Sequence, residues 1–236
     1  YVEGTLVEGQ YARYEINHGY DNRLINADEI VTQVTEFKIY EFINGEEVDV
    51  TSNYEIDTYE TGKLTVTPRP LHITGKSATF VYDGNEHSLS DDTKPESVDG
   101  LVPDEEIISV TYGGAITDVG TKTNVLREVV LSSRSSNYTI TFTFGTLEVT
   151  PYELDITTGS AEKYYDGAIM TEQSLNVTLA NADHRINLAA GQKYPFIINA
   201  GSVVNEYVCA ITDKNGRDVT QNYSINYNYG TLTVNK

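Results

Sequence analysis

The chain has 236 residues, and its 35 Asp and Glu against 16 Lys and Arg give a formal net charge of −19 at pH 7. This charge argues against a nucleic acid as partner, because phosphate binding needs a basic patch, and against contact with an anionic membrane surface. The content of 39% hydrophobic and 22% charged residues is typical of a globular protein and not of a disordered one.

An internal repeat organises the chain. The pattern Asn-Tyr-x-Ile, followed by Gly-x-Leu-x-Val, occurs at Asn53, Asn137 and Asn222, at intervals of 84 and 85 residues. Apolar and polar side chains alternate in these stretches, which predicts half-buried strands. Repeats of this length are typical of tandem small domains. We therefore divide the chain into repeat one (1–68), repeat two (69–151) and repeat three (152–236).

The beginning of repeat one differs from the other two. Repeats two and three open with matching strands, Leu71–Ala78 and Leu154–Ala161, which lead to Tyr-Asp-Gly at Tyr82 and Tyr165. In repeat one the nearest equivalent is Tyr1–Gly4, and nothing precedes it. We expect that repeat one is truncated or that its opening strand is supplied differently. An unpaired edge there would favour strand addition from another chain.

Turn residues separate the predicted strands within each repeat. Asp118-Val119-Gly120 in repeat two corresponds to Asn199-Ala200-Gly201 in repeat three and to Asn26-Ala27 in repeat one; such residues favour left-handed backbone angles. Asn44-Gly45 predicts a hairpin, and Gly145 predicts a hairpin or two strands joined by a tight turn. Roughly six or seven short strands per repeat predict an all-β fold of tandem small β domains, each an Ig-like sandwich or β-grasp-like.

Short proline-containing junctions join the repeats. Thr67–Leu71 contains two prolines, and Thr150–Leu154 contains Pro151. Proline fixes its own backbone and holds the preceding residue extended, so we expect stiff joints in place of flexible linkers. A domain of this size is roughly 30 Å across, so three in line predict an elongated rod of roughly 90 Å.

The order of these motifs resembles a known family. Tyr-Asp-Gly at Tyr82 and Tyr165, Gly100-Leu101 in the middle, Asp118-Val119-Gly120-Thr121 later and Asn-Tyr-x-Ile with Gly-Thr-Leu-x-Val at the end are similar to the MBG repeat domains of the YDG and YGX types. The resemblance covers most of repeats two and three and the later half of repeat one, which departs from the Tyr-Asp-Gly and Gly-Thr motifs. Such domains occur in tandem in large bacterial surface proteins and adhesins, so the resemblance implies export to the cell surface and no known catalytic residues.

No set of residues predicts catalysis or a metal site. The histidines His18, His72, His87 and His184 lie at unrelated repeat positions, without metal-ligand spacing. The acidic stretch Asp91–Glu106 and the loop Asp213–Asp218 offer oxygen ligands for calcium, but the loop lacks the distal glutamate of a calcium-binding loop, and we favour solvated turns. The chain has no phosphate-binding loop or nucleophile elbow. We predict no metal, no cofactor and no enzyme activity.

Two further features have structural interpretations. The single cysteine, Cys209, lies in the apolar run Glu206–Ile211 and is predicted to be a buried small apolar side chain. The repeated Asn-Tyr pairs raise the alternative of a repeated ligand site. We interpret the asparagine as closing a turn and the tyrosine as capping the edge of the core.

The sequence favours a non-catalytic stalk segment of a bacterial cell-surface adhesin, located outside the cell, whose partners are the neighbouring repeats of the same chain. The alternative is a binding module for a host glycan or host protein, with some of the 18 tyrosines in contact loops. An enzyme domain is the least favoured function. Because the chain begins at Tyr1 inside repeat-like sequence, we interpret it as a segment of a longer protein or as a mature fragment.

Overall fold

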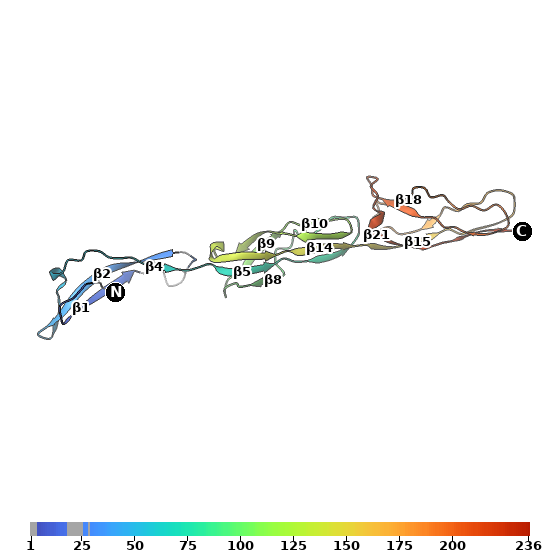
Figure 1. Cartoon of the computed structure of the whole chain (residues 1–236). Helices are drawn as coiled ribbons and strands as arrows, with labels where there is room; N and C mark the ends of the chain where they lie inside the picture. The colour runs from blue at the N-terminus through green and yellow to red at the C-terminus, as the bar shows by residue number, and fades with distance from the viewer. Residues whose placement is uncertain (1–3, 18–25, 28) are drawn as a thin grey trace. The chain divides into compact units, whose positions relative to one another are not determined.

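The structure is a computed structural model that describes residues 4–17, 26–27 and 29–236. The predicted all-β class is confirmed: strands joined by turns make up the fold, and the described residues contain short 3-10 helices but no α-helix. Figure 1 shows these strands along the chain, coloured from the N-terminus to the C-terminus. None of the helices in the described ranges has the length and apolar character to cross a membrane.

Each of the three repeats contains several strands and a short 3-10 helix. Repeat one contains β1 (Gln10–Asn17), β2 (Glu29–Ile43), β3 (Glu46–Asp49), η1 (Thr51–Asn53) and β4 (Gly62–Thr65). Repeat two contains β5 (Arg69–Thr74), β6 (Ala78–Val81), β7 (His87–Ser88), β8 (Ser97–Asp99), β9 (Ile107–Tyr112), β10 (Ala115–Ile116), β11 (Gly120–Asn124), β12 (Leu126–Leu131), η2 (Ser135–Asn137), β13 (Tyr138–Thr143) and β14 (Gly145–Thr150). Repeat three contains β15 (Tyr152–Thr158), β16 (Ala161–Tyr164), β17 (Leu175–Asn176), β18 (Arg185–Leu188), β19 (Gly201–Val204), β20 (Cys209–Thr212), η3 (Thr220–Asn222), β21 (Tyr223–Asn228) and β22 (Thr231–Asn235).

Repeats two and three share one sheet plan. The sheets β13-β5-β8, β11-β14-β6 and β12-β9 of repeat two have the counterparts β21-β15-β17, β19-β22-β16 and β20-β18 in repeat three. The pair β10-β7 corresponds to an isolated bridge between Met170 and Ile197. The parallel pairings include β14 with β6 in repeat two and β15 with β21 and β16 with β22 in repeat three. The strands that carry the repeated sequence motifs therefore occupy equivalent places in the two repeats.

Repeat one has a simpler sheet. Strand β2 pairs with β1, β3 and β4, and the predicted hairpin turn at Asn44-Gly45 joins β2 to β3. Asn44 and Gly45 both have positive φ, 52° and 86°, as this turn chemistry requires. Residues 55–61, which follow η1, form no strand, and the described part of repeat one has no counterpart of β5 or β15 to pair with them.

The chain divides into two compact units. The first comprises Tyr1–Leu71, Gly100–Glu106 and Leu131–Thr141, and the second comprises His72–Asp99, Ile107–Val130 and Phe142–Lys236. The first unit thus holds repeat one with part of repeat two, and the second holds the rest of repeat two with all of repeat three.

The core of the second unit combines side chains of two repeats. Its members are fully or almost fully buried: Tyr82, Val149, Leu154, Ile156, Tyr207, Cys209, Ile211, Val219 and Tyr223. Burial of each Val, Leu or Ile side chain of this core stabilises the fold by about 1.5–3 kcal/mol. The predicted burial of Cys209 is confirmed, since 2% of its surface is exposed, and this burial raises the pKa of its thiol.

Of the two arrangements predicted at Gly145, the hairpin is wrong, and the chain passes from strand β13 to strand β14 through the single residue Phe144. Strands β13 and β14 lie in different sheets, and β14 pairs with β11 and β6. The glycine is required for another reason: a Cβ at Gly145 would lie 1.9 Å from the carbonyl oxygen of Lys76, and one at Gly230 would lie 2.2 Å from that of Gly159. Both glycines therefore allow a close approach of two backbones.

This close approach predicts that Gly230→Ala destabilises repeat three by about 1–3 kcal/mol, because the clash is with backbone that cannot move aside. Gly62→Ala is the matched control, since its Cβ would meet only the side chain of Thr32. The control should change stability by less than about 0.5 kcal/mol. Urea denaturation, with amide hydrogen exchange to assign each transition to a repeat, measures both. Equal effects of the two substitutions would contradict the close-approach explanation.

Candidate functional site

The joint between repeats two and three is the best-organised polar site of the second unit. Its central residue, Asn222, ends η3 and is 1% exposed. The turn forms because Asp218 Oδ1 accepts a hydrogen bond from the Thr220 N–H at 2.9 Å, while Thr220 Oγ1 accepts one from the Ile211 N–H at 2.8 Å. These local bonds fix the backbone that presents the Asn222 side chain.

The Asn222 side chain binds the turn that precedes β11 in repeat two. Its Oδ1 accepts a hydrogen bond from the Val119 N–H at 2.9 Å, and its Nδ2 donates one to Asp118 Oδ1 at 2.8 Å. Gly120, with φ of 141°, completes this turn. We call this pair of hydrogen bonds the amide clasp. It satisfies both halves of a buried amide, which would otherwise carry a desolvation cost.

The amide clasp recurs in the first unit with different residues. There Asn137 Oδ1 accepts a hydrogen bond from the Ala27 N–H at 2.9 Å, and Asn137 Nδ2 donates one to Asn26 Oδ1 at 3.2 Å. The prediction that the repeated asparagines close a turn is therefore incomplete. Asn137 and Asn222 each end a 3-10 turn, but their side chains also bind the preceding repeat. The repetition of both the Asn-Tyr pair and its partner turn was the available signal for this contact.

An ion pair accompanies the clasp at Asn222. Arg217 donates two hydrogen bonds to the carboxylate of Asp118, Nη1 to Oδ2 at 2.6 Å and Nη2 to Oδ1 at 3.1 Å. The Arg217 guanidinium lowers the pKa of Asp118, and burial opposes this shift. Both side chains are about half exposed, at 50% and 42%, so the pair contributes at most about 1 kcal/mol.

Aromatic side chains of repeats two and three pack against one another at the same joint. Tyr82 of repeat two is 1% exposed and meets Tyr223 of repeat three edge-on, with ring centroids 5.5 Å apart. His184 stacks on Tyr82 at 5.9 Å, and its Nδ1 lies 2.6 Å from the Tyr223 hydroxyl. Each such ring pair adds about 0.5–1.5 kcal/mol to the burial of its area. Tyr223, predicted to cap the edge of the core, is 7% exposed and is a member of the core.

Tight packing at this joint requires a glycine in the Tyr-Asp-Gly motif. Gly84 has φ of 78°, and a Cβ there would lie 2.9 Å from both Asn181 Nδ2 and His184 Nε2. Asn181 Nδ2 also donates a hydrogen bond to the carbonyl oxygen of Asp83 at 2.9 Å. The motif thus contacts the turn at Asn181 and His184 of the next repeat.

Burial shifts the titration of two groups in this joint. It raises the pKa of Tyr223 to about 12, and it lowers the pKa of His184 below its usual 6.5, although Asp213 and Asp183 act against that shift. His184 is therefore neutral in the folded protein near pH 7. This histidine supports packing between repeats and has the Tyr223 hydroxyl as its hydrogen-bond partner.

The acidic segments considered for calcium form turns and ion pairs. Asp213 Oδ1 accepts hydrogen bonds from the N–H groups of Asn215 and Arg217, and Asp92 pairs with Lys76 at 2.6 Å. Within the described residues, no group of three or more His, Cys, Asp or Glu side chains is placed to hold a metal ion. His87 stacks on Phe80 with centroids 4.4 Å apart, and His18 lies outside the described residues.

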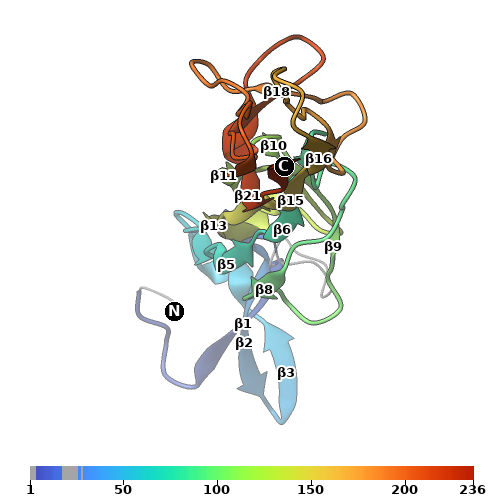
Figure 2. The same ribbon diagram turned by 90° about the vertical axis from the view of Figure 1, so that its right-hand side faces the viewer.

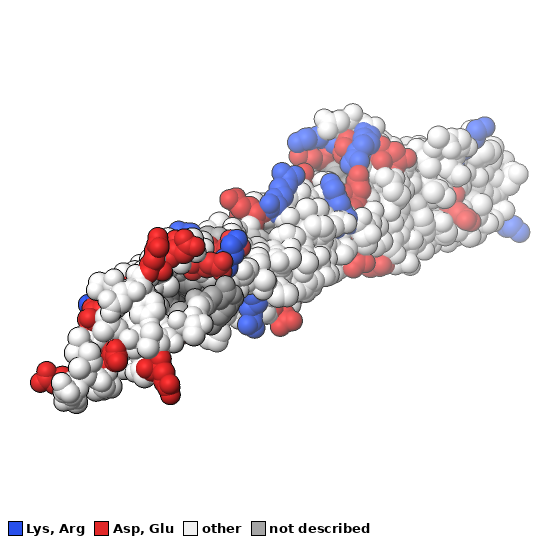
Figure 3. Space-filling model, turned by 60° about the vertical axis from the view of Figure 1, so that its left-hand side comes forward, with Lys and Arg blue, Asp and Glu red and all other residues white. Residues whose placement is uncertain are grey.

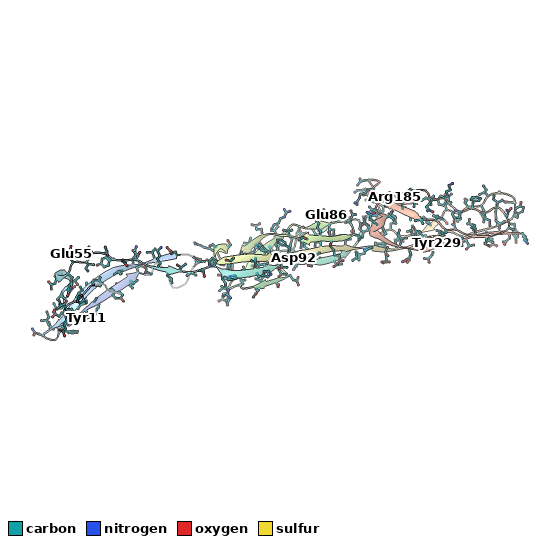
Figure 4. All side chains as sticks on the ribbon, in the orientation of Figure 1. Tyr11, Glu55, Glu86, Asp92, Arg185 and Tyr229 are labelled. Atoms are coloured by element: carbon teal, nitrogen blue, oxygen red, sulfur yellow. The ribbon has the colours of Figure 1, made fainter. Side chains whose placement is uncertain are left out.

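A second feature lies on the sheet of repeat one. Tyr11 stacks with Tyr40 at 6.1 Å and with Phe42 at 6.0 Å, and Arg13 lies over the Tyr40 ring at 5.2 Å. Figure 4 labels Tyr11, which lies on β1. Phe42 is 62% exposed, so part of this cluster faces solvent. We call these four residues the aromatic face.

Figure 3 shows Asp and Glu side chains, in red, distributed over the displayed surface.

No protein-family model and no curated protein matches this chain. The similarity to MBG repeats rests on the sequence motifs alone.

The geometry of the clasp predicts that Asn222→Ala destabilises the second unit by about 1–3 kcal/mol, since it leaves the partly buried Val119 N–H without its acceptor. The equivalent residue of repeat one, Asn53, is exposed. Asn53→Ala is therefore the matched control and should cost less than about 0.5 kcal/mol. Urea denaturation of the full chain measures both variants. A loss at Asn53 as large as that at Asn222 would show that the turn itself, and not the clasp, carries the energy.

The position of His184 predicts an acid-sensitive joint. Its folded-state pKa is below 6.5, so below pH 6.5 the unfolded chain binds a proton that the folded chain does not. The stability of the second unit should be complete above about pH 6.5 and should fall as the pH drops below that value. His184→Gln should flatten this part of the profile. Thermal melting between pH 5 and 7.5 measures it; an unchanged slope in the variant would exclude His184 as the cause.

Proposed function

We propose that this chain is a non-catalytic stalk segment of a bacterial cell-surface protein. Its tandem β repeats keep another part of that protein at a distance from the cell. The observation that carries the proposal is the recurrence of the amide clasp, formed by Asn137 in one unit and by Asn222 in the other. A contact that recurs from one joint to the next orients each repeat on the preceding one in the same way, and a stalk requires such a regular arrangement.

The short connections between repeats support the same function. Only Pro151 separates β14 from β15, so the last strand of repeat two leads directly into the first strand of repeat three. Proline restricts the backbone on both sides of this connection. Together with the clasp, it limits bending at the joint.

The proposed placement outside the cell rests on the sequence resemblance to MBG repeats and on the acidic surface. A net charge of −19 keeps crowded copies of a protein apart. Antibodies raised against the chain should label intact cells of the organism that makes it, and protease added to those cells should remove the label. Label that appears only after the cells are permeabilised would exclude a surface location.

A stalk predicts an extended particle in solution. Three bodies of roughly 30 Å in line give a radius of gyration of about 27 Å, against about 18 Å for a compact chain of this length. Small-angle X-ray scattering of the full chain measures this value. Asn222→Ala should broaden the distance distribution, since it loosens one joint, and Asn53→Ala should leave it unchanged. A radius of gyration near 18 Å would overturn the stalk.

The aromatic face supports a second function, binding of a glycan. Stacked rings with an exposed edge present an apolar platform against which the apolar face of a sugar can pack, and Arg13 and Glu47, 2.6 Å apart, offer polar groups beside it. This platform lies on strands, whereas the sequence favoured contact loops.

Binding of the full chain to a glycan array tests this second function. Phe42→Ala should weaken any binding by at least about tenfold, because it removes part of the exposed platform. Phe142→Ala is the control, since Phe142 belongs to another exposed aromatic pair, with Phe144 at 6.3 Å. Equal losses in the two variants, or no bound glycan, would argue against the aromatic face as a glycan site.

A further inference from the structure

The end of repeat three that contains the C-terminus has the same parts as the joint of repeat two. Tyr165 occupies the place of Tyr82, and its N–H binds the Asn235 carbonyl oxygen at 2.9 Å, as the Tyr82 N–H binds that of Thr150. Strand β16 pairs with the last strand, β22, so that Tyr164 lies opposite Asn235, and Figure 2 shows β16 near the mark for the C-terminus. We call the surface formed by Tyr165, Asn199, Ala200 and Lys236 the tip.

The turn at the tip is built like the two turns that receive an amide clasp. Asn199 and Ala200 correspond to Asn26 and Ala27, with the same two residue types. Gly201 follows with φ of 145°, close to the 141° of Gly120 in the joint of repeat two. The N–H and the amide oxygen that a clasp would bind are therefore present in the required order.

The tip is uncovered where its counterpart is buried. Tyr165 is 57% exposed, whereas Tyr82 is 1% exposed. A Cβ at Gly167 would meet nothing within 4 Å, whereas one at Gly84 would meet Asn181 and His184 of the next repeat. An open hollow of about 500 Å³, lined by the four residues of the tip, lies at this surface. In repeat two, the equivalent residues Tyr82, Asp118 and Val119 contact the Asn222-Tyr223 turn of repeat three.

We propose that the tip is a docking site for the Asn-Tyr turn of a further repeat of this same kind. The incoming asparagine accepts a hydrogen bond from the Ala200 N–H and donates one to Asn199 Oδ1, and the incoming tyrosine covers Tyr165. The closest template is the clasp of Asn137 on Asn26 and Ala27, in which the side-chain acceptor is the neutral amide of Asn26. The inference rests on the joint geometry and not on the location of the protein in the cell.

A chain extended by one repeat tests the docking site. A second copy of residues 152–236 is joined directly after Lys236, because Lys236 corresponds to Pro151. We expect hydrogen exchange of the Ala200 amide to slow by at least about tenfold relative to the 236-residue chain. Tyr165 should lose its reactivity toward tetranitromethane. Asn222→Ala in the appended copy alone should restore fast exchange at Ala200, while Asn53→Ala in the extended chain should not.

Two outcomes would overturn the proposal. The appended repeat could fold, shown by slow exchange in its own core, and leave Ala200 and Tyr165 as accessible as before. It could also fail to fold; since the identical sequence folds after repeat two, this failure would show that the tip does not support a neighbour. Neither outcome bears on the stalk function, which scattering and surface labelling of the original chain test separately.

Discussion

The structure of each joint depends on one amide side chain, which is buried at Asn222 and partly buried at Asn137. A primary amide has an acceptor and donors, and in the low-dielectric interior an unmatched one costs more than a matched one contributes. Asn222 meets this constraint by binding a backbone N–H and a side-chain oxygen of the same short turn. The two bonds fix the direction as well as the distance between η3 and that turn, because both are made by one rigid planar group. Orientation, more than affinity, is what such a contact supplies.

The amide clasp does not require a charged acceptor in the turn that it binds. The turn bound by Asn222 contains Asp118, which also pairs with Arg217, whereas the turn bound by Asn137 contains the neutral Asn26 at the same place. The clasp therefore forms with a neutral side-chain acceptor as well as with a charged one. Because exposed ion pairs are weakened by salt and contribute little, a neutral clasp keeps its geometry over a wider range of solution conditions.

Sequence periodicity was sufficient for the class of fold but not for the contacts between strands. Alternation predicted strands such as β13 and β21, and apolar context predicted the burial of Cys209, because these properties depend on local pattern. The role of Gly145 was missed, since the backbone that approaches it belongs to Lys76, far away in sequence. The clasp was missed for the same reason: a turn signal describes what Asn222 does to its own backbone and nothing about its partner.

The parallel pairing of β15 with β21 shows how neighbouring repeats depend on one another. Strand β15 enters repeat three as the continuation of β14, so repeat two sets where the partner of β21 lies. In repeat one no described strand takes the place of β15, and residues 55–61 remain outside any sheet. In repeats two and three, the Asn-Tyr segment forms a strand beside the opening strand of its repeat, β5 or β15. Since β21 begins at the residue after Asn222, the same connection that completes the sheet also positions the clasp, and order in a repeat follows from order in the joint before it.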